Sequence, residues 1–383
     1  MKLTRWLLIV FVIYVLIFFS HALFLQKTVY GDGVFYYSWV RSVVVDRDIN
    51  FTNEYAHFGV AAPVTPGGLP GNKHPIGVPL FWLPWYTQAH AIIGGIGYEL
   101  PYQLLIGFIS VLAALSGLLL LYRLLAQSFS NTASILATAS IAGATNLLFY
   151  GAVDPVNSHA VSFFATTVYL SFLFSKDVSP FLTGCALGFC ALVRPQDAAL
   201  VLLAIPVYLN FSFARPGLAK LKSAIAFILG SIIAFSPQLL AWYALYGTAW
   251  TSPYLTAGET LRWWSPHFFD VLFSINNGLF LWTPMTLLGF LGLFFWNGKR
   301  RGWFIALFLL ETATVGAWSI WWQGASYSGR MFVSSLPILA LGIASVCTKL
   351  QKLHFTPSYY VLFLIGSLSI INLFLIVFYL AVH

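Results

Sequence analysis

The sequence is short of charged residues. Only 8% of its 383 residues are Asp, Glu, Lys or Arg, whereas soluble globular proteins carry about a quarter. Hydrophobic residues make up 59% of the chain, and its mean hydropathy is +0.83. This composition excludes a disordered chain, a fibrous protein and a water-exposed enzyme.

Cysteine is scarce too, and the three present, Cys185, Cys190 and Cys347, all lie inside apolar segments. Such a set supplies neither a disulfide framework nor the ligands of a zinc site. The net charge of +8 could suggest binding to nucleic acid. However, the basic residues form short clusters between apolar stretches, which is typical of topology signals in membrane proteins. We therefore expect no nucleic-acid partner.

Long apolar stretches recur along the whole chain. A helix needs about 20 mainly apolar residues to cross a bilayer. The sequence therefore predicts an all-α polytopic bundle of about 11 spans, within a range of roughly 10 to 13. The predicted spans are Arg5 to Leu25, 101–122, 131–150, 157–175, 179–194, 197–213, 223–246, 279–296, 302–322, 332–348 and 357–381.

The distribution of charge predicts the orientation. Ser20-His21-Ala22 resembles a signal-peptidase site, but the apolar stretch is long and continuous, which favours an uncleaved helix with a cytoplasmic N-terminus. Alternating spans then place twelve of the 19 lysines and arginines on the cytoplasmic side, as the positive-inside rule requires. Of the eleven acidic residues, only Asp177 lies clearly in a cytoplasmic loop, and Glu311 lies within a span. We therefore expect the functional site on the outer face.

Two outer loops are long, at residues 26–100 and 247–278. In the first, residues 33–45 predict a short interfacial helix, and a turn-rich piece around Pro66-Gly67-Gly68 follows it. Residues 75–97 are apolar, and we interpret them as a re-entrant or interfacial helix. A full crossing there would invert everything downstream and put Lys299-Arg300-Arg301 on the outer side.

Ionisable residues gather at the outer boundary of the spans, where a charged side chain is costly and marks a functional site. The carboxylates are Asp32, in Gly31-Asp32-Gly33, and Asp154, near the end of the third span. The cations are Lys73, Arg194 and Arg330. A carboxylate can take a proton from an attacking hydroxyl, and cations stabilise a departing phosphate. This combination favours glycosyl transfer from a lipid-linked sugar phosphate.

Each candidate also has a purely structural explanation. Gly31-Asp32-Gly33 fits a turn that leads into an N-capped helix, and Arg194 and Arg330 fit side chains that reach toward lipid headgroups. His159 fits a satisfied histidine at a helix start better than it fits a metal ligand. Glu311 fits a buried acid paired with a neighbouring hydroxyl or arginine.

Several segments, in collinear order over nearly the whole chain, make the sequence resemble a known superfamily. They are Gly31-Asp32-Gly33 with Tyr36-Tyr37, Asp46 to Tyr55, Asn72 to Gly77, Ser158-His159-Ala160, Leu192 to Gln196, Gly278 to Pro284 and Trp322 to Arg330. The superfamily is that of the bacterial GT-C glycosyltransferases, relatives of dolichyl-phosphate-mannose–protein mannosyltransferases and lipid A aminoarabinose transferases.

The resemblance implies one GT-C domain over residues 1–383, in the inner membrane of a bacterium. It implies transfer of a sugar from a polyprenyl-phosphate donor to an envelope glycan, lipid or protein on the outer face, with inversion and without a nucleotide sugar. Asp32 then takes the position of the catalytic aspartate, and Asp154 matches the acid of the second outer loop. Lys73, Arg194 and Arg330 become candidates for binding the carrier phosphate. Further candidates for substrate binding are Tyr36, Arg41, His74, His159 and Tyr327.

The sequence also departs from this family. Many members carry two adjacent acids in the first loop, whereas Asp32 stands alone between glycines. Some relatives bind a metal through a glutamate at the position of Asn72, so we expect no required metal and no other cofactor. His267 and Glu259 in the second long loop leave a divalent metal open. The chain ends soon after its last span, so we expect no fixed acceptor-binding domain.

The alternative function is a transporter or flippase of a lipid-linked saccharide, and a third is a catalytically inactive scaffold. A transporter would carry polar groups near the bilayer midplane and broken helices in corresponding halves of the chain. The predicted midplane is nearly empty apart from Glu311, and no repeat of halves is visible. The sequence therefore favours the transferase.

Overall fold

The computed structural model describes residues 3–209, 218–352 and 358–382. Within these ranges the chain is mainly helical, and its β pairing is limited to the isolated bridges Val64–Pro70 and Leu261–Trp318. The α-helices are α1 (Leu3–Leu25), α2 (Gly33–Arg41), α3 (Thr52–Phe58), α4 (Gly77–Ile93), α5 (Leu100–Ala126), α6 (Asn131–Gly143), α7 (His159–Phe174), α8 (Pro180–Val193), α9 (Leu218–Tyr246), α10 (Pro253–Thr256), α11 (Phe268–Phe273), α12 (Leu279–Trp282), α13 (Pro284–Leu293), α14 (Arg301–Ala317), α15 (Leu336–Lys352) and α16 (Ser358–Val382). Short 3₁₀ or π segments are η1 (Ser42–Asp46), η2 (Phe149–Val153), η3 (Pro195–Leu203), η4 (Ile205–Leu209) and η5 (Arg330–Ser335). The predicted all-α class is confirmed.

Five of the described helices are long and apolar enough to cross a membrane. They are α1, α5, α9, the continuous η5–α15 unit and α16. Each coincides with a predicted span, and the chain is a multi-pass membrane protein. The other predicted spans coincide with shorter or interrupted helices, so the number of crossings stays a prediction. Of the predicted elements, Lys2, Arg215 and the end of the span at 197–213 lie outside the described residues.

Polar side chains explain one of the interruptions. The predicted span at 131–150 is broken, because α6 ends at Gly143 and η2 starts only at Phe149. Between them, the Asn146 amide donates to the carbonyl oxygen of Gly329 at 3.0 Å. In the same break the Leu147 N–H donates to Thr145 Oγ1 at 3.3 Å, a local side-chain bond of the kind that competes with a continuous helix. The break directs the chain toward Asp154.

Helices α8 and α9 pack at very close range through glycine. A Cβ at Gly184 would lie 1.9 Å from the carbonyl oxygen of Phe227, and one at Gly230 would lie 2.1 Å from that of Phe181. Small residues at such a crossing allow two backbones to approach within a membrane. The contact fixes the N-terminal half of α8 against α9, and α8 leads at its other end into Arg194.

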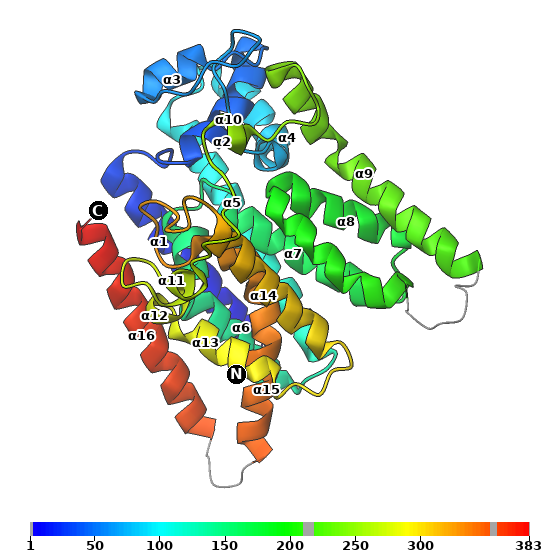
Figure 1. Cartoon of the computed structure of the whole chain (residues 1–383). Coiled ribbons are helices and arrows are strands. Elements are labelled where there is room, and N and C mark those ends of the chain that lie inside the picture. Colours follow the sequence, from blue (N-terminus) through cyan, green and yellow to red (C-terminus); the bar gives the residue numbers. More distant parts are fainter. Residues whose placement is uncertain (1–2, 210–217, 353–357, 383) are drawn as a thin grey trace.

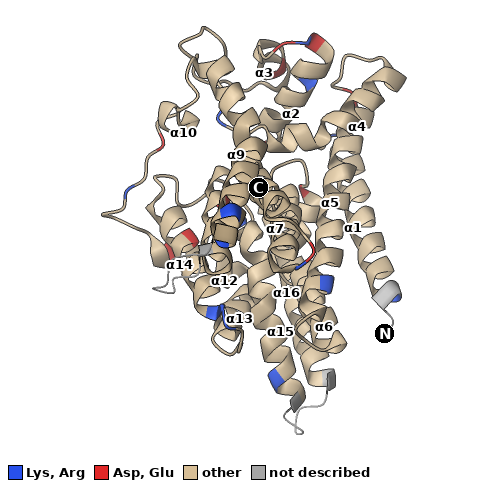
Figure 2. Ribbon diagram, turned by 90° about the vertical axis from the view of Figure 1, so that its right-hand side faces the viewer, with Lys and Arg blue, Asp and Glu red and all other residues tan. Residues whose placement is uncertain are grey.

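The helices of the first long loop gather at one end of the molecule. Figure 1 shows α2 and α3 at the upper end, with α10 and α4 close by. The predicted helix at 33–45 appears as α2 continued by η1, and the predicted helix at 75–97 appears as α4. Figure 2 shows most Asp and Glu in the upper half, whereas Lys and Arg also mark the lower helix ends. This polarity agrees with the charge bias of the sequence.

Candidate active site

Two glycines hold Asp32 at the start of α2. Gly31 has a φ of +54°, in the left-handed region that favours glycine. A Cβ at Gly33 would lie 2.3 Å from the carbonyl oxygen of Val156, so glycine is needed for the η2–α7 connection to come this close. Asp32 occupies the N-cap, but its side chain makes no capping hydrogen bond. Its carboxylate is therefore available to the site.

Arg330 is the ion-pair partner of Asp32. Its Nη1 lies 2.7 Å from Asp32 Oδ2, and the two side chains are 20% and 38% exposed, respectively. Arg330 begins η5 after a turn in which Ser328 has a φ of +52°, and Asn146 binds that turn through the Gly329 carbonyl. The buried Nε of Arg330 has no hydrogen-bond partner among the described residues. The guanidinium is thus a positioned cation with a donor left over.

A second guanidinium, that of Arg194, lies beside Arg330. Arg194 is only 3% exposed, and its Nη1 lies 3.0 Å from His159 Nδ1 and 3.5 Å from the Arg330 carbonyl oxygen. When the side-chain amide of Gln196 is oriented with its oxygen toward Arg194, this oxygen accepts hydrogen bonds from Arg194 Nη2 at 2.6 Å and from Nε at 2.9 Å. Because a guanidinium only donates, His159 Nδ1 must accept, which places the imidazole proton on Nε2. The neighbours that bind Arg194 are therefore uncharged.

Lys73 and His74 complete the wall of the site. Lys73 forms an ion pair with Glu259, a 3% exposed residue of the second long loop. His74 stacks on Phe35 with 4.9 Å between ring centroids, and its buried Nε2 has no partner among the described residues. Burial lowers the pKa of His74 to about 4, so its imidazole is neutral at physiological pH.

Three cavities meet at Asp32. The loop cavity, of about 320 Å³, lies between the two long loops and is lined by Phe35, Thr65, Lys73, His74, Tyr246 and Thr256, among others. The cation cavity, of about 60 Å³, is lined by Tyr36, Lys73, His74, His159, Arg194 and Arg330, among others. The span-end cavity, of about 680 Å³, lies beside the ends of α1 and α16 and includes Leu25, Tyr30, Asp154, Asn157, Arg330 and Tyr379. Asp32 is the residue that lines all three.

The environments of the two carboxyls move their pKa values in opposite directions. At Asp32, burial disfavours the charged form, but the charges of Arg330 and Lys73 outweigh it, and the pKa of Asp32 is lowered. At Asp154, burial and the nearby charge of Asp32 raise the pKa to about 7. Asn157 and Tyr30 hydrogen-bond to Asp154 and oppose part of this rise. Such a split is typical of carboxyl pairs with different roles in catalysis.

The structure brings together eight of the ten residues predicted from sequence. Asp32, Asp154, Arg330, Arg194, Lys73, Tyr36, His74 and His159 line one or more of the three cavities. His159 begins α7, as its sequence context predicted. Glu311 is half-buried and accepts hydrogen bonds from the Ser334 and Ser335 hydroxyls, which confirms its predicted pairing with a neighbouring hydroxyl.

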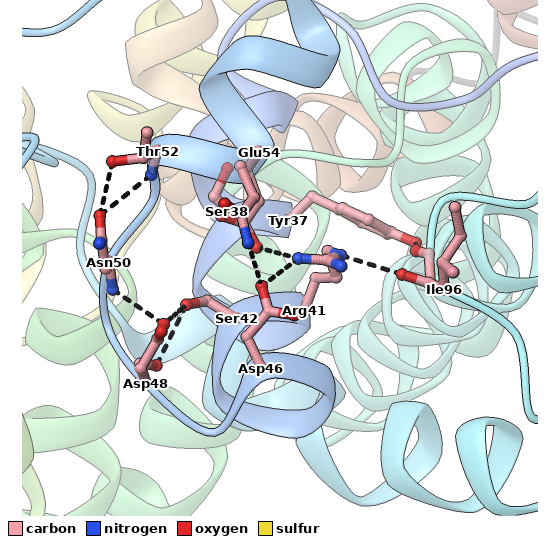
Figure 3. A network of polar contacts seen from close by, with 12 residues as sticks. Tyr37, Ser38, Arg41, Ser42, Asp46, Asp48, Asn50, Thr52, Glu54 and Ile96 are labelled. Atoms are coloured by element: carbon pink, nitrogen blue, oxygen red, sulfur yellow. Dashed lines mark hydrogen bonds and ion pairs between the residues drawn. The ribbon is translucent and has the colours of Figure 1, made fainter.

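Arg41 is the first of the two predicted residues that the structure places elsewhere. Figure 3 shows its guanidinium between Asp46 and Glu54, and its Nε donates to the Ile96 carbonyl oxygen at 3.1 Å. The guanidinium also lies 4.1 Å from the ring centroid of Tyr98. Its Nε and Nη1 therefore join α2 to η1, to α3 and to the α4–α5 connection, and Arg41 lines none of the three cavities.

Tyr327 is the second. Its side chain is fully buried, and its hydroxyl donates to Asn372 Oδ1 at 2.6 Å on α16. Its ring stacks on Phe149 with 5.0 Å between centroids. These contacts fix the loop before Arg330 against η2 and α16, and Tyr327 lines none of the three cavities.

Two lining residues had no signal in the sequence. Tyr254 and Trp318 line the cation cavity from the second long loop and the end of α14. Only the tertiary fold brings these segments to Asp32. Tyr30 was within reach of sequence reasoning, because it directly precedes Gly31.

The described residues offer no cluster suited to a metal ion: no three His, Cys, Asp or Glu side chains gather among them. His267 and Glu259, the two candidate ligands for a divalent metal in the second long loop, have different partners. His267 Nδ1 lies 2.8 Å from Asp270 Oδ2, whereas Glu259 binds Lys73.

Comparison with known proteins agrees with this architecture. A family model described as dolichyl-phosphate-mannose-protein mannosyltransferase matches residues 96–242, which include Asp154 and Arg194. No curated protein matches the sequence. The crystal structure of ArnT from Cupriavidus metallidurans bound to undecaprenyl phosphate superposes with a TM-score of 0.56 at 12% identity, covering 91% of this chain and 60% of that one. The chain has the GT-C glycosyltransferase fold.

A second GT-C structure leads to the same fold. The Archaeoglobus fulgidus oligosaccharyltransferase in complex with Zn and sulfate superposes with a TM-score of 0.52 at 14% identity, covering 96% of this chain and 52% of that one. Apo ArnT from Cupriavidus metallidurans gives 0.54 at 10% identity, covering 91% of this chain and 59% of that one. The chain therefore spans between about half and three fifths of the length of the solved structures that it matches.

Proposed function

We propose that the chain is an inverting glycosyltransferase that moves a sugar from a polyprenyl-phosphate donor to a cell-envelope acceptor. The observation that carries the proposal is the position of Asp32, where three cavities meet beside a paired arginine. Two substrates that enter from opposite sides can meet at this carboxylate. The match to ArnT, whose structure holds undecaprenyl phosphate, supports a donor of this chemical class.

The cation cavity suits the phosphate of the donor. Arg194 has no carboxylate within ion-pair distance among the described residues, and Arg330 keeps an unpartnered Nε. Guanidinium groups bind phosphate oxygens in a two-pronged geometry and stay charged at all physiological pH values. Lys73 supplies a third positive charge on the same wall. Tyr36, His74 and His159 line the same space and would contact the sugar phosphate.

Asp32 acts as the general base in this proposal. Its carboxylate takes the proton of the acceptor hydroxyl while the hydroxyl oxygen attacks the anomeric carbon. The bond from this carbon to the phosphate oxygen breaks, and the electron pair leaves with the phosphate. Arg194 and Arg330 stabilise the charge that develops there. Attack opposite to the leaving group inverts the anomeric configuration, and Asp154 shapes the side of the site that faces the span-end cavity.

We further propose that transfer needs no metal or other cofactor. The positive charge beside Asp32 comes from Arg330 at 2.7 Å, and no three metal-ligating side chains gather among the described residues. The proposed location is the inner membrane of a bacterium, with the N-terminus in the cytoplasm and the site on the outer face. The charge bias of the helix ends supports this orientation.

Purified protein in lipid vesicles tests the function with radiolabelled polyprenyl-phosphate sugars and an envelope-lipid extract as acceptor. Release of unlabelled carrier with label in the acceptor is the expected result, and Asp32→Asn should abolish most of it. Asp177→Asn, an exposed acid outside the cavities, is the matched control and should retain full turnover. Movement of intact donor across the vesicle without turnover would contradict the proposal and support a flippase.

A further inference from the structure

A second polar cavity lies at the opposite end of the bundle from Asp32. Helix α7 begins at His159 in the active site and ends at Phe174 in this cavity, 16 residues away. At 1.5 Å per residue the two ends are about 24 Å apart. The cavity has a volume of about 440 Å³ and is lined by Gln127, Ser128, Phe174, Trp296, Lys299 and Arg300, among others. It belongs to no part of the proposed reaction.

The charge of this basic cavity is one-sided. Lys299 and Arg300 line it, and none of the described residues that line it is acidic. Neither cation forms an ion pair with a described carboxylate. The Arg300 guanidinium lies 5.3 Å from the ring centroid of Phe174, a distance that allows a cation–π contact and holds the side chain at the wall. Lys299 is exposed and Arg300 is half-buried, so an anion that enters the cavity can reach both cations.

The remaining lining describes the occupant more closely. Leu124, Phe304 and Leu341 add apolar side chains to the lining, and Gln127 and Ser128 add hydrogen-bonding groups. Trp296 contributes an aromatic ring of the kind enriched where membrane meets water. A cavity of about 440 Å³ lies in the size range of small-molecule sites and has room for a phosphodiester headgroup. A lining that combines two cations with apolar side chains fits a molecule that is anionic at one end and apolar at the other.

We propose that the cavity lined by Lys299 and Arg300 binds the headgroup of an anionic phospholipid. Basic pockets between transmembrane helices bind such headgroups, and each Lys or Arg near the surface strengthens the attraction. The occupied cavity would tie the ends of α5 and α7 to α14 and α15, since residues of all four helices line its wall. This inference is independent of the proposed transferase activity.

The test follows the thermal unfolding midpoint of the full-length protein in neutral detergent. Phosphatidylglycerol is titrated into the micelles, with phosphatidylcholine and inorganic phosphate as separate arms. A ligand that binds only the folded state raises the midpoint with its concentration. We expect a saturating rise with phosphatidylglycerol and none with the other two. An equal rise with phosphatidylcholine, or with inorganic phosphate, would overturn the lipid assignment.

Two variants locate the effect. Lys299→Gln with Arg300→Gln should raise the half-saturating phosphatidylglycerol concentration by about 30-fold, because two attractive charges are lost. The matched control is Lys220→Gln with Lys222→Gln, two exposed lysines at the start of α9 that should leave the titration unchanged. Ser128→Phe places a bulky side chain in the cavity without removing a charge. It therefore tests the proposed site independently if the double variant fails to fold. A wild-type titration in Ser128→Phe would contradict the proposed site.

Discussion

Replacing Asp32 by Asn separates its role as a base from its role as the partner of Arg330. The amide has nearly the same shape but accepts no proton at physiological pH. General base catalysis contributes about 10²- to 10⁴-fold, so kcat should fall by that factor. Because the pKa of Asp32 is lowered, the wild-type carboxylate is ionised at neutral pH and the loss should be as large at pH 6 as at pH 8.

The same substitution should leave donor binding intact or improve it. In the free protein the Asp32 carboxylate holds Arg330 at 2.7 Å, and the donor phosphate must compete for that guanidinium. A partly exposed ion pair such as this one is worth about 1 kcal/mol or less. Removing the competing carboxylate should therefore lower the donor Kd by up to about fivefold. The variant should also stay folded, since the loss of one such pair is small.

The assay compares kcat with donor Kd in the same preparation. Turnover of radiolabelled donor gives kcat, and equilibrium binding of unlabelled donor, followed by intrinsic tryptophan fluorescence, gives Kd. Asp177→Asn should change neither. Near-normal turnover in Asp32→Asn would move the base to Asp154, and weaker donor binding would show that Asp32 holds the donor and does not compete with it.

Three further predictions follow from the same geometry. Arg330→Lys keeps the positive charge but loses the two-pronged guanidinium, so kcat at saturating donor should fall by roughly 10- to 100-fold. The control Arg301→Lys should change kcat little. Wild-type turnover in Arg330→Lys would mean that Arg330 is only a membrane anchor. The pKa of Asp154 is raised from 3.8 to about 7, so the folded protein holds a proton that the unfolded chain has lost, and wild-type stability falls as pH rises through this window. Asp154→Asn should therefore stabilise the protein by roughly 1–3 kcal/mol more at pH 8 than at pH 4, and equal shifts in thermal unfolding at the two pH values would refute this. The predicted orientation is tested with single cysteine substitutions. A cysteine at Val64, which is 69% exposed, should react with an impermeant maleimide in intact cells, whereas a cysteine at the exposed Asn297 should react only after permeabilisation. The reverse pattern would overturn the predicted topology.

The sequence predicts helices well where one local property decides them. Twenty or more apolar residues in a row identify α1, α5, α9 and α16, because the backbone in a bilayer must satisfy its own hydrogen bonds. It fails where a distant contact interrupts the helix. The break after α6 contains Asn146, whose side chain bonds to the Gly329 carbonyl 183 residues further along the chain. No local pattern around Asn146 announces that partner.

The candidate site shows the same division. Flanking glycines and a position beside an apolar span marked Asp32, and a loop rich in Gly and Ser marked Arg330, but neither pattern could show that the two side chains pair. Arg41 looked equally functional in sequence, since it is a cation in the first outer loop. Its two carboxylate partners lie on η1 and α3, and only their placement shows that the loop itself uses the charge. The type of a residue predicts its chemistry, whereas its partner decides whether that chemistry is free for a substrate.

The three cations of the site also differ in whether a carboxylate compensates their charge. Lys73 is compensated by Glu259 and Arg330 by Asp32, whereas the nearest partners of Arg194 are the uncharged side chains of His159 and Gln196. In the proposed reaction, a donor phosphate would find Arg194 without a paired carboxylate and would compete with Asp32 for Nη1 of Arg330. That exchange would free the Asp32 carboxylate when the donor is in place. Since a carboxylate released from a guanidinium is a stronger base, binding of the donor would prepare the group that deprotonates the acceptor. Tighter donor binding in Asp32→Asn is the measurement that separates this coupling from a purely structural ion pair.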